Sequence, residues 1–582
     1  MNAPLTTNAH AQDGAKVTHE ATVANSTGTI TTLALTMMTV ATVAHLTNDV
    51  QMAFYGLSSV TFFIGGCLLF FVPTGLVAAE LASGWSQKGG IFRWVGEGLG
   101  RFPAIACLLI LWFRMAFMFG SSIPTTAART GFFTADFDRA VQFAEESHPL
   151  SISLPILLGW LVFYWFICWC ATRGVKVFAS IAKYGVIFGT FVPLAIITVL
   201  CLVWLAQGHR PAIDFDAASL IPTWQGMPTL ALAAIVFLSY AGIDINAAHI
   251  NNLKKPSKQF PLVVFISMVL SLGVFIVGTL VIAMVEPNIN LVSTLVAVYR
   301  DLGAAIGFPQ LYIVLYYLAT FNTFAVLITN LAGPSRMLGE AGRSGFLPKW
   351  LQENNKFGMP SRLIYLQMGI MTAVAFVVFL LPNVEGFMAL IGQLITILCM
   401  VYYIVMFVAF LKLRYDQPNR PRSFKVPGGM VGAWITAGVG MASATFAIAL
   451  AFVPPAQLLH VIGSELNYIL IILCMIGVVA LACVLLYRAS LRHTEWLDTN
   501  NNFAPFTWQI EGLAKPGRVA SNVPSDVMCA DQHAMGMPIK RSYDADEIVD
   551  LAQFADTQQT SERQHTVNTS QYEFRGLVEE NS

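Results

Sequence analysis

Residues 467–487 read NYILIILCMIGVVALACVLLY, a run without a single charged side chain. A helix rises about 1.5 Å per residue and the hydrocarbon core of a bilayer is about 30 Å thick, so about 20 apolar residues cross it. This run therefore predicts a membrane-spanning helix. Eleven further segments meet the same criterion. We predict an all-α integral membrane protein with twelve transmembrane helices, at residues 29–49, 57–81, 104–128, 152–171, 178–206, 228–250, 260–284, 308–334, 363–382, 386–411, 430–453 and 467–487.

The composition of the whole chain agrees with lipid as its solvent. Of 582 residues, 56% are hydrophobic and 11% are charged, where about 25% charged is usual for soluble proteins. The 33 basic and 33 acidic residues give zero net charge, which argues against a nucleic-acid partner. The nine cysteines have neither zinc-site spacing nor the pattern of a secreted disulfide framework. The composition therefore argues against a soluble enzyme, and we expect no cofactor.

Basic residues indicate how the chain is oriented in the membrane. The connections after the even-numbered predicted spans hold 18 Lys and Arg residues, and the opposite connections hold 4. Since cytoplasmic loops retain positive charge, both termini are expected in the cytoplasm. Residues 1–28 form a polar N-terminal segment without a cleaved signal peptide, residues 29–487 the transport domain, and residues 488–582 a polar C-terminal tail.

A few polar side chains lie inside the predicted spans. Such groups cost several kcal/mol in hydrocarbon unless they are satisfied, so they point to a transport pathway. They comprise His45, Asn48 and Asp49 in the first span, Arg114 in the third, the stretch SYAGIDIN at 239–246 in the sixth, and Asn322 and Asn330 in the eighth.

Each of these residues has more than one interpretation. Gly242 beside an acid suits a helix that unwinds in the membrane, or it is a packed glycine. His45 either carries protons or is a neutral, hydrogen-bonded histidine. Asp49 either pairs with His45, one turn away, or lies in water at the end of its span. Arg114 lies too deep to reach the interface, so it binds a substrate carboxylate or forms an ion pair, with Asp244 as one partner.

Several stretches resemble the amino acid, polyamine and organocation transporter superfamily, and within it the bacterial glutamate/GABA antiporter family. The resemblance covers about residues 30–490. The matching stretches are PTGLVAAELA at 73–82, GGIFRWV at 89–95, SYAGID at 239–244, HINN at 249–252 with Pro256, GPSR at 333–336, GMP at 358–360, RYDQP at 414–418 and FKVPGG at 424–429.

The resemblance implies a fold in which residues 29–206 and 228–411 are inverted repeats, followed by two extra helices within 430–487. The first and sixth spans are then broken near Val43-Ala44-His45 and Tyr240-Ala241-Gly242, where free backbone groups bind the substrate. The residues that it places at the substrate are Val43, Ala44, His45, Asn48, Arg114, Tyr240, Ala241, Gly242 and Asn330, and His45 and Asp244 are expected to serve gating or proton coupling.

Three departures from the family pattern bear on the substrate. His45 stands where small residues are common, Asp244 stands where glutamate is common, and Asn252 and Val326 stand where glutamate/GABA exchangers tend to carry acids. The resemblance therefore implies an amino acid antiporter more firmly than it implies glutamate for GABA.

The expected activity is alternating-access exchange of glutamate, or a related amino acid, for GABA or another decarboxylation product. The resemblance places it in a bacterial inner membrane, functionally coupled to a cytosolic decarboxylase in acid resistance, with a C-terminal tail that plugs the pore at neutral pH. A solvated tail is the alternative. A proton-coupled uptake permease and a non-transporting amino acid sensor are the alternative functions, and the oligomeric state is left open.

Overall fold

The structure, a computed structural model, describes residues 30–44, 46–85, 89–134, 136–145, 150–222, 234, 236–244, 253–287, 289, 293–380, 384–418, 420, 422, 424–454, 464–497 and 506. The elements formed by these residues are all helical, as the apolar runs predict. Ten helices in this part of the chain are long and apolar enough to cross a membrane. They cover Ser58–Gly84, Arg101–Phe133, Leu154–Ala171, Ala179–Ala206, Lys258–Val285, Leu311–Phe346, Ser361–Phe379, Leu390–Asp416, Gly429–Ala451 and Glu465–Arg492.

The two predicted spans outside this set are the first and the sixth, and neither is one continuous helix in the described residues. In the first, α2 (Thr32–Val43) ends before Ala44, whose backbone is extended, and α3 (Leu46–Ala53) follows. In the sixth, residues 236–239 are helical and residues 240–244 form a turn. Much of the sixth predicted span lies outside the described residues, so the count of twelve and the inverted repeats stay predictions.

Two long helices contain a widened turn just before a proline. The π-helical turn Cys67–Phe71 joins α4 (Ser58–Gly66) to α5 (Val72–Gly84), which has Pro73 in its first turn. The turn Ile187–Phe191 likewise joins α10 (Val175–Val186) to α11 (Val192–Ala206), which begins Val192-Pro193. Proline has no N–H and its ring clashes with the carbonyl four residues earlier, so the widened turn lets each helix continue.

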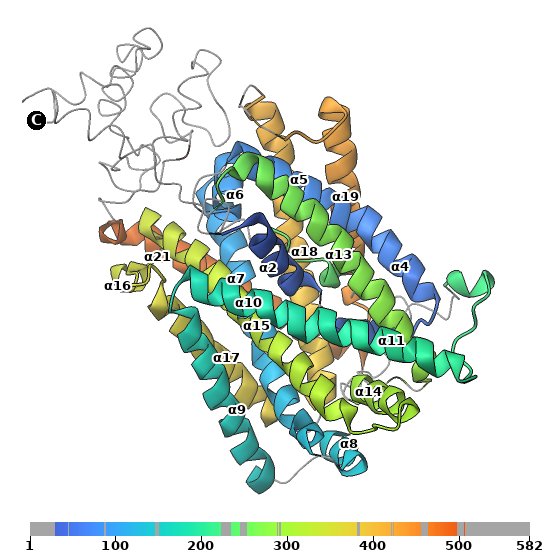
Figure 1. The fold of residues 1–582 in the computed structure, drawn as a ribbon. Coiled ribbons are helices and arrows are strands. Elements are labelled where there is room, and N and C mark those ends of the chain that lie inside the picture. The colour runs from blue at the N-terminus through green and yellow to red at the C-terminus, as the bar shows by residue number, and fades with distance from the viewer. Residues whose placement is uncertain are drawn as a thin grey trace, which may run out of the picture.

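The remaining helices complete the bundle. They are α6 (Ile91–Leu99), α7 (Arg101–Ala128), α8 (Phe137–Glu145), α9 (Leu150–Ala171), α13 (Pro256–Val285), α14 (Thr294–Ala305), α15 (Leu311–Ala341), α16 (Lys349–Gln352), α17 (Ser361–Phe379), α18 (Val384–Asp416), α19 (Gly429–Ala451) and α21 (Glu465–Arg492). The interrupted helix α2 lies inside the bundle, where it contacts α10, α13 and α15 (Figure 1). Helix α18 packs against α6, α7 and α19.

The outermost helices present apolar side chains to the surroundings. On α21, Leu470, Leu473, Leu481 and Leu485 are all exposed. Contiguous apolar surface of this kind is unfavourable in water and is what the acyl chains of a bilayer cover. The protein is therefore a multi-pass membrane protein.

Candidate functional site

The turn at residues 240–244 places a buried carboxylate against two tyrosines of α18. Asp244 is only 1% exposed. The Tyr403 hydroxyl donates a hydrogen bond to Asp244 Oδ1 at 2.5 Å, and the Tyr402 hydroxyl donates to Oδ2. The backbone N–H of Gly242, which the turn leaves without a helical acceptor, donates to the Tyr403 hydroxyl oxygen at 2.7 Å. Two tyrosines of helix α18 therefore supply hydrogen-bond partners both for the Asp244 carboxylate and for the backbone N–H of Gly242.

The shape of this turn depends on a glycine and on a tyrosine anchor. Gly242 has a φ of +121°, a conformation that side chains with a Cβ rarely adopt. The Tyr240 hydroxyl donates to the main-chain oxygen of Phe63 at 2.9 Å, and its ring stacks on Phe71 with centroids 4.7 Å apart. A Cβ at Gly66 would lie 3.2 Å from the Tyr240 ring. The second predicted span thus holds the start of the turn by close packing.

Arg114 lies in the middle of α7 and is 5% exposed. Its Nη1 donates to Cys399 Sγ of α18 at 2.8 Å. Within the described chain, no oxygen of Asp244 lies within ion-pair distance of it, so the ion pair expected as one alternative is absent, although the two charges are within electrostatic range. Arg114 Nε is buried with no acceptor. Because a buried guanidinium needs acceptors, this donor can take an anionic ligand.

The predicted residues of the first break are described in part. Val43 is the last residue of α2, and Ala44 is buried with φ −98° and ψ 111°. His45 lies outside the described residues, and so does the side chain of Asn48. Asp49 is fully buried, so the alternative that it lies in water at the end of the span is wrong. Its burial follows from the packing of α3 against α13 and α14.

Buried amide side chains supply further acceptors. Asn330 Nδ2 donates to the main-chain oxygen of Val326 at 2.9 Å, and Asn330 Oδ1 has no partner among the described residues. The side-chain oxygens of Asn322 and Gln393 are likewise buried and unpaired in the described part of the structure. Unpaired buried acceptors are rare in folded proteins, and a ligand or water that donates hydrogen bonds would satisfy them.

The analysis of the sequence missed Tyr402, Tyr403 and Cys399, which α18 brings to Asp244 and Arg114. The available signal was a pair of adjacent tyrosines inside an apolar run, since a buried tyrosine hydroxyl needs a partner. That signal does not name the partner, which lies about 160 residues away for both tyrosines.

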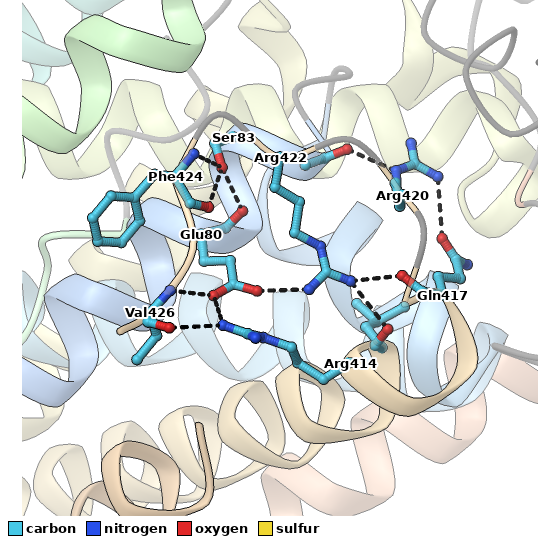
Figure 2. Close-up of polar contacts among 10 residues, drawn as sticks. Glu80, Ser83, Arg414, Gln417, Arg420, Arg422, Phe424 and Val426 are labelled. Carbon is cyan, nitrogen blue, oxygen red and sulfur yellow. Dashed lines mark hydrogen bonds and ion pairs between the residues drawn. The ribbon is translucent and has the colours of Figure 1, made fainter. Parts of the chain in front are cut away.

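A second polar cluster, shown in Figure 2, lies where α5 ends. Glu80 is completely buried and accepts three hydrogen bonds, from Arg414 Nη2 at 2.5 Å, from Arg422 Nη1 at 2.7 Å and from the backbone N–H of Val426 at 2.7 Å. The stretches PTGLVAAELA and RYDQP to FKVPGG, far apart in the sequence, meet here.

Backbone contacts extend this Glu80 cluster on both sides of the carboxylate. Ser83 Oγ lies 3.0 Å from the main-chain oxygen of Phe424, to which it donates. Arg420 donates through Nε to the main-chain oxygen of Gly84 at 2.7 Å and through Nη1 to Gln417 Oε1 at 3.2 Å. The cluster therefore fastens the end of α5 to the end of α18 and to the segment that follows α18.

The sequence profile described as "Amino acid permease" matches residues 28–480, most of the chain. The chain belongs to this family. The permease is a membrane transporter and not an enzyme. It is 28% identical over 426 residues to an uncharacterised transporter of Legionella pneumophila, covering 73% of this chain and 89% of the relative. It is 27% identical over 409 residues to a glutamate/gamma-aminobutyrate antiporter of Lactococcus lactis, covering 69% and 78%. A probable agmatine/putrescine antiporter of Lactococcus lactis is 24% identical over 365 residues, covering 62% and 74%.

Part of the C-terminal tail of the permease contacts the transport domain. Phe506 is 2% exposed and packs against Phe92 of α6, with ring centroids 5.6 Å apart. The Arg93 guanidinium lies 5.2 Å from the centre of the Phe506 ring. A Cβ at Gly96 would lie 2.3 Å from that ring, so only glycine leaves room for it. Residues 507–582 of the tail lie outside the described residues.

Proposed function

We propose that this permease is an antiporter that exchanges glutamate, or a related amino acid, for GABA or another decarboxylation product. The observation that carries the proposal is the pair of interrupted helices, α2–α3 and the turn at 240–244, with Arg114 and Asp244 close to the second. Backbone that departs from a helix at membrane depth is tolerated where it lines a pathway. The Lactococcus relatives named as antiporters support exchange rather than one-way uptake.

The substrate carboxylate is proposed to bind at the two breaks, beside Val43, Ala44, Tyr240, Ala241 and Gly242. The N–H groups of Ala44, Tyr240, Ala241 and Gly242 already donate within the protein, to Val40, Val236, Leu238 and Tyr403, so the substrate would have to replace these acceptors. Partial positive charge at the start of a half-helix favours an anion there.

Side chains around these breaks complete the proposed site. Arg114 adds a full positive charge, and its Nε is a free donor in the described structure. Asn330 offers an acceptor for an ammonium group, and His45 and Asn48 line the first break. Asp244 and His45 serve gating or proton coupling, since each changes charge on taking up a proton.

The Glu80 cluster supports alternating access as the mechanism. It joins α5 to the end of α18 through an acid with three donors. When the bundle opens at the end where Glu80 lies, Glu80 on α5 would separate from Arg414 and Arg422. When the bundle closes, these ion pairs would form again. We place this end in the cytoplasm, together with both termini, from the distribution of basic residues. In a bacterial inner membrane, coupling to a cytosolic decarboxylase would make each exchange cycle remove a proton equivalent and confer acid resistance.

The tail is proposed to close the cytoplasmic end at neutral pH. Support comes from Phe506, which is buried against α6 near the Glu80 cluster: Arg93 touches the Phe506 ring, and Arg93 also pairs with Glu97, which accepts from Gln417. The tail thus contacts the same helix that borders this cluster.

Counterflow in proteoliposomes tests the exchange. Vesicles are loaded with unlabelled glutamate, GABA or buffer, and uptake of labelled glutamate is followed without a pH gradient. We expect uptake to be several-fold faster into glutamate- or GABA-loaded vesicles than into buffer-loaded ones. Equal uptake in all three would reject exchange. Uptake that follows an imposed pH gradient without internal substrate would select a proton-coupled permease, and ligand binding without flux would select a sensor.

A further inference from the structure

Asp49 in α3 is a buried acid that the proposed substrate site does not use. Its side chain is 0% exposed, and neither carboxylate oxygen has a hydrogen-bond partner in the described structure. Asp244, the other buried acid near the breaks, differs because it accepts from two tyrosines. Asp49 therefore needs a separate explanation.

The surroundings of Asp49 come from three elements. Thr279 of α13 donates to its main-chain oxygen at 3.4 Å, which holds the backbone rather than the carboxylate. Tyr299 of α14 and Tyr240 of the second break lie within electrostatic range of the carboxylate. Asp49 follows the first break by about one turn, and Tyr240 begins the second. Asp49 of α3 is thus surrounded by α13, α14 and the start of the second break.

None of the described side chains near Asp49 carries a positive charge that could neutralise its carboxylate. The Tyr240 hydroxyl already donates to Phe63, and the Tyr299 hydroxyl is buried and without a partner in the described part of the chain. These tyrosines are the ionisable groups that face Asp49 from the described elements packed around it; α13 offers Thr279, and His45 lies outside the described residues.

An ionised carboxylate without partners is very costly in such a place. Burial of an unpaired charge costs several kcal/mol, so the group must be neutralised by a proton or by a cation. A metal cation requires several oxygen ligands, and no cluster of three metal-binding side chains occurs among the described residues. A proton requires only the carboxylate itself, and it removes the charge without any further ligand.

We propose that Asp49 is a proton-binding site, separate from Asp244, which is protonated when the bundle is closed around it. The carboxylate takes a proton from hydronium when α3 is open to water, giving the neutral acid and one water molecule, and returns it when the pathway opens again. Resting on the proposed function, this site carries one proton inward with one substrate and one proton outward with the other, so exchange moves no net proton but each closure of the bundle requires a proton.

Infrared difference spectroscopy tests the protonation itself. The purified wild type, Asp49→Asn and Asp244→Asn are compared in lipid at pH 7, in H₂O and D₂O. We expect a protonated-carboxyl C=O band that shifts in D₂O, is absent in Asp49→Asn and is retained in Asp244→Asn. A band that survives in Asp49→Asn, or no band in the wild type, would overturn the proposal.

If Asp49→Asn does not fold, Asp49→Glu takes its place in the same measurement. The C=O band should then move in frequency, because the acid and its distance to Tyr299 both change. An unmoved band would assign the signal to another group and overturn the proposal. Size-exclusion elution and thermal unfolding establish folding for each variant.

Transport measurements test whether closure requires the proton. The rate of wild-type counterflow should fall as the pH rises from 5 to 8, because each closure of the bundle then lacks its proton more often. Asp49→Asn, a neutral mimic of the acid, should retain counterflow and show a weaker dependence of its rate on pH than the wild type. The same dependence on pH in Asp49→Asn as in the wild type would overturn the proposal. Absence of counterflow in the wild type would instead reject the exchange function and leave the infrared result standing.

Discussion

Replacing Glu80 with glutamine should destabilise the folded protein strongly. The amide keeps the shape of the side chain and can still accept from the backbone N–H of Val426, but the negative charge is lost. The Arg422 side chain is 1% exposed and that of Arg414 is 10% exposed, so two buried guanidiniums would then face a neutral group. Removing one partner of a buried ion pair typically costs about 3–5 kcal/mol, which we expect for Glu80→Gln.

The chain offers a matched surface pair as a control. Glu353 and Arg362 lie 2.8 Å apart, with side chains 63% and 46% exposed. The same chemical change, Glu353→Gln, should cost less than about 1 kcal/mol because water screens the pair.

The free energy of unfolding can be measured for both variants and the wild type by SDS titration in mixed micelles. Dye labelling of the cysteine thiols provides a second probe of unfolding, since six of the eight cysteines in the described structure are buried. A Glu80→Gln loss within about 1 kcal/mol of the Glu353→Gln loss would refute the reasoning, because the Glu80 carboxylate would then be no more important than an exposed one.

Three further predictions concern the breaks and the tail. Tyr403→Phe removes two hydrogen bonds and Tyr402→Phe removes one, so the first should lower the free energy of unfolding by about 1 kcal/mol more in the same SDS titration; an equal loss would contradict the geometry. Gly242→Leu should abolish counterflow, because the turn needs its positive φ, whereas Gly273→Leu, with open space beside its Cα, should leave it intact. Truncation after residue 490 should raise exchange at pH 7, and Phe506→Ala should reproduce part of the increase; unchanged rates in both would show that the tail does not close the pathway.

Element lengths could be predicted from the sequence because they depend on local chemistry, whereas the positions of the breaks were implied by the resemblance to a known family. The predicted span 152–171 and α9 (Leu150–Ala171) end together, since Thr172 and Arg173 end the apolar run. Gly242 by itself fitted either an unwound helix or a packed glycine, and its positive φ in the turn supports the first. The residues that contact the substrate remain predictions.

The partners of the polar residues could not be predicted, because they depend on packing between distant helices. Arg114 and its acceptor Cys399 are 285 residues apart. Asp49 stands near the end of a predicted span, and only the packing of α13 and α14 against α3 shows that it is buried. The sequence left two alternatives open for each of Arg114 and Asp49. For Asp49, the tertiary contacts exclude the one in which the side chain lies in water.

The Glu80 cluster also bears on which solutes approach the end of the bundle where it lies, because two arginines share its one carboxylate. Among the described residues, Arg414 and Arg422 both pair with Glu80, which leaves one positive charge of this trio uncompensated. Low-dielectric surroundings screen that excess poorly, whereas in bulk solution at physiological salt the field decays over about 8 Å. We therefore expect the local potential to favour anionic amino acids over amines that carry only positive charge, and this preference to weaken as ionic strength increases.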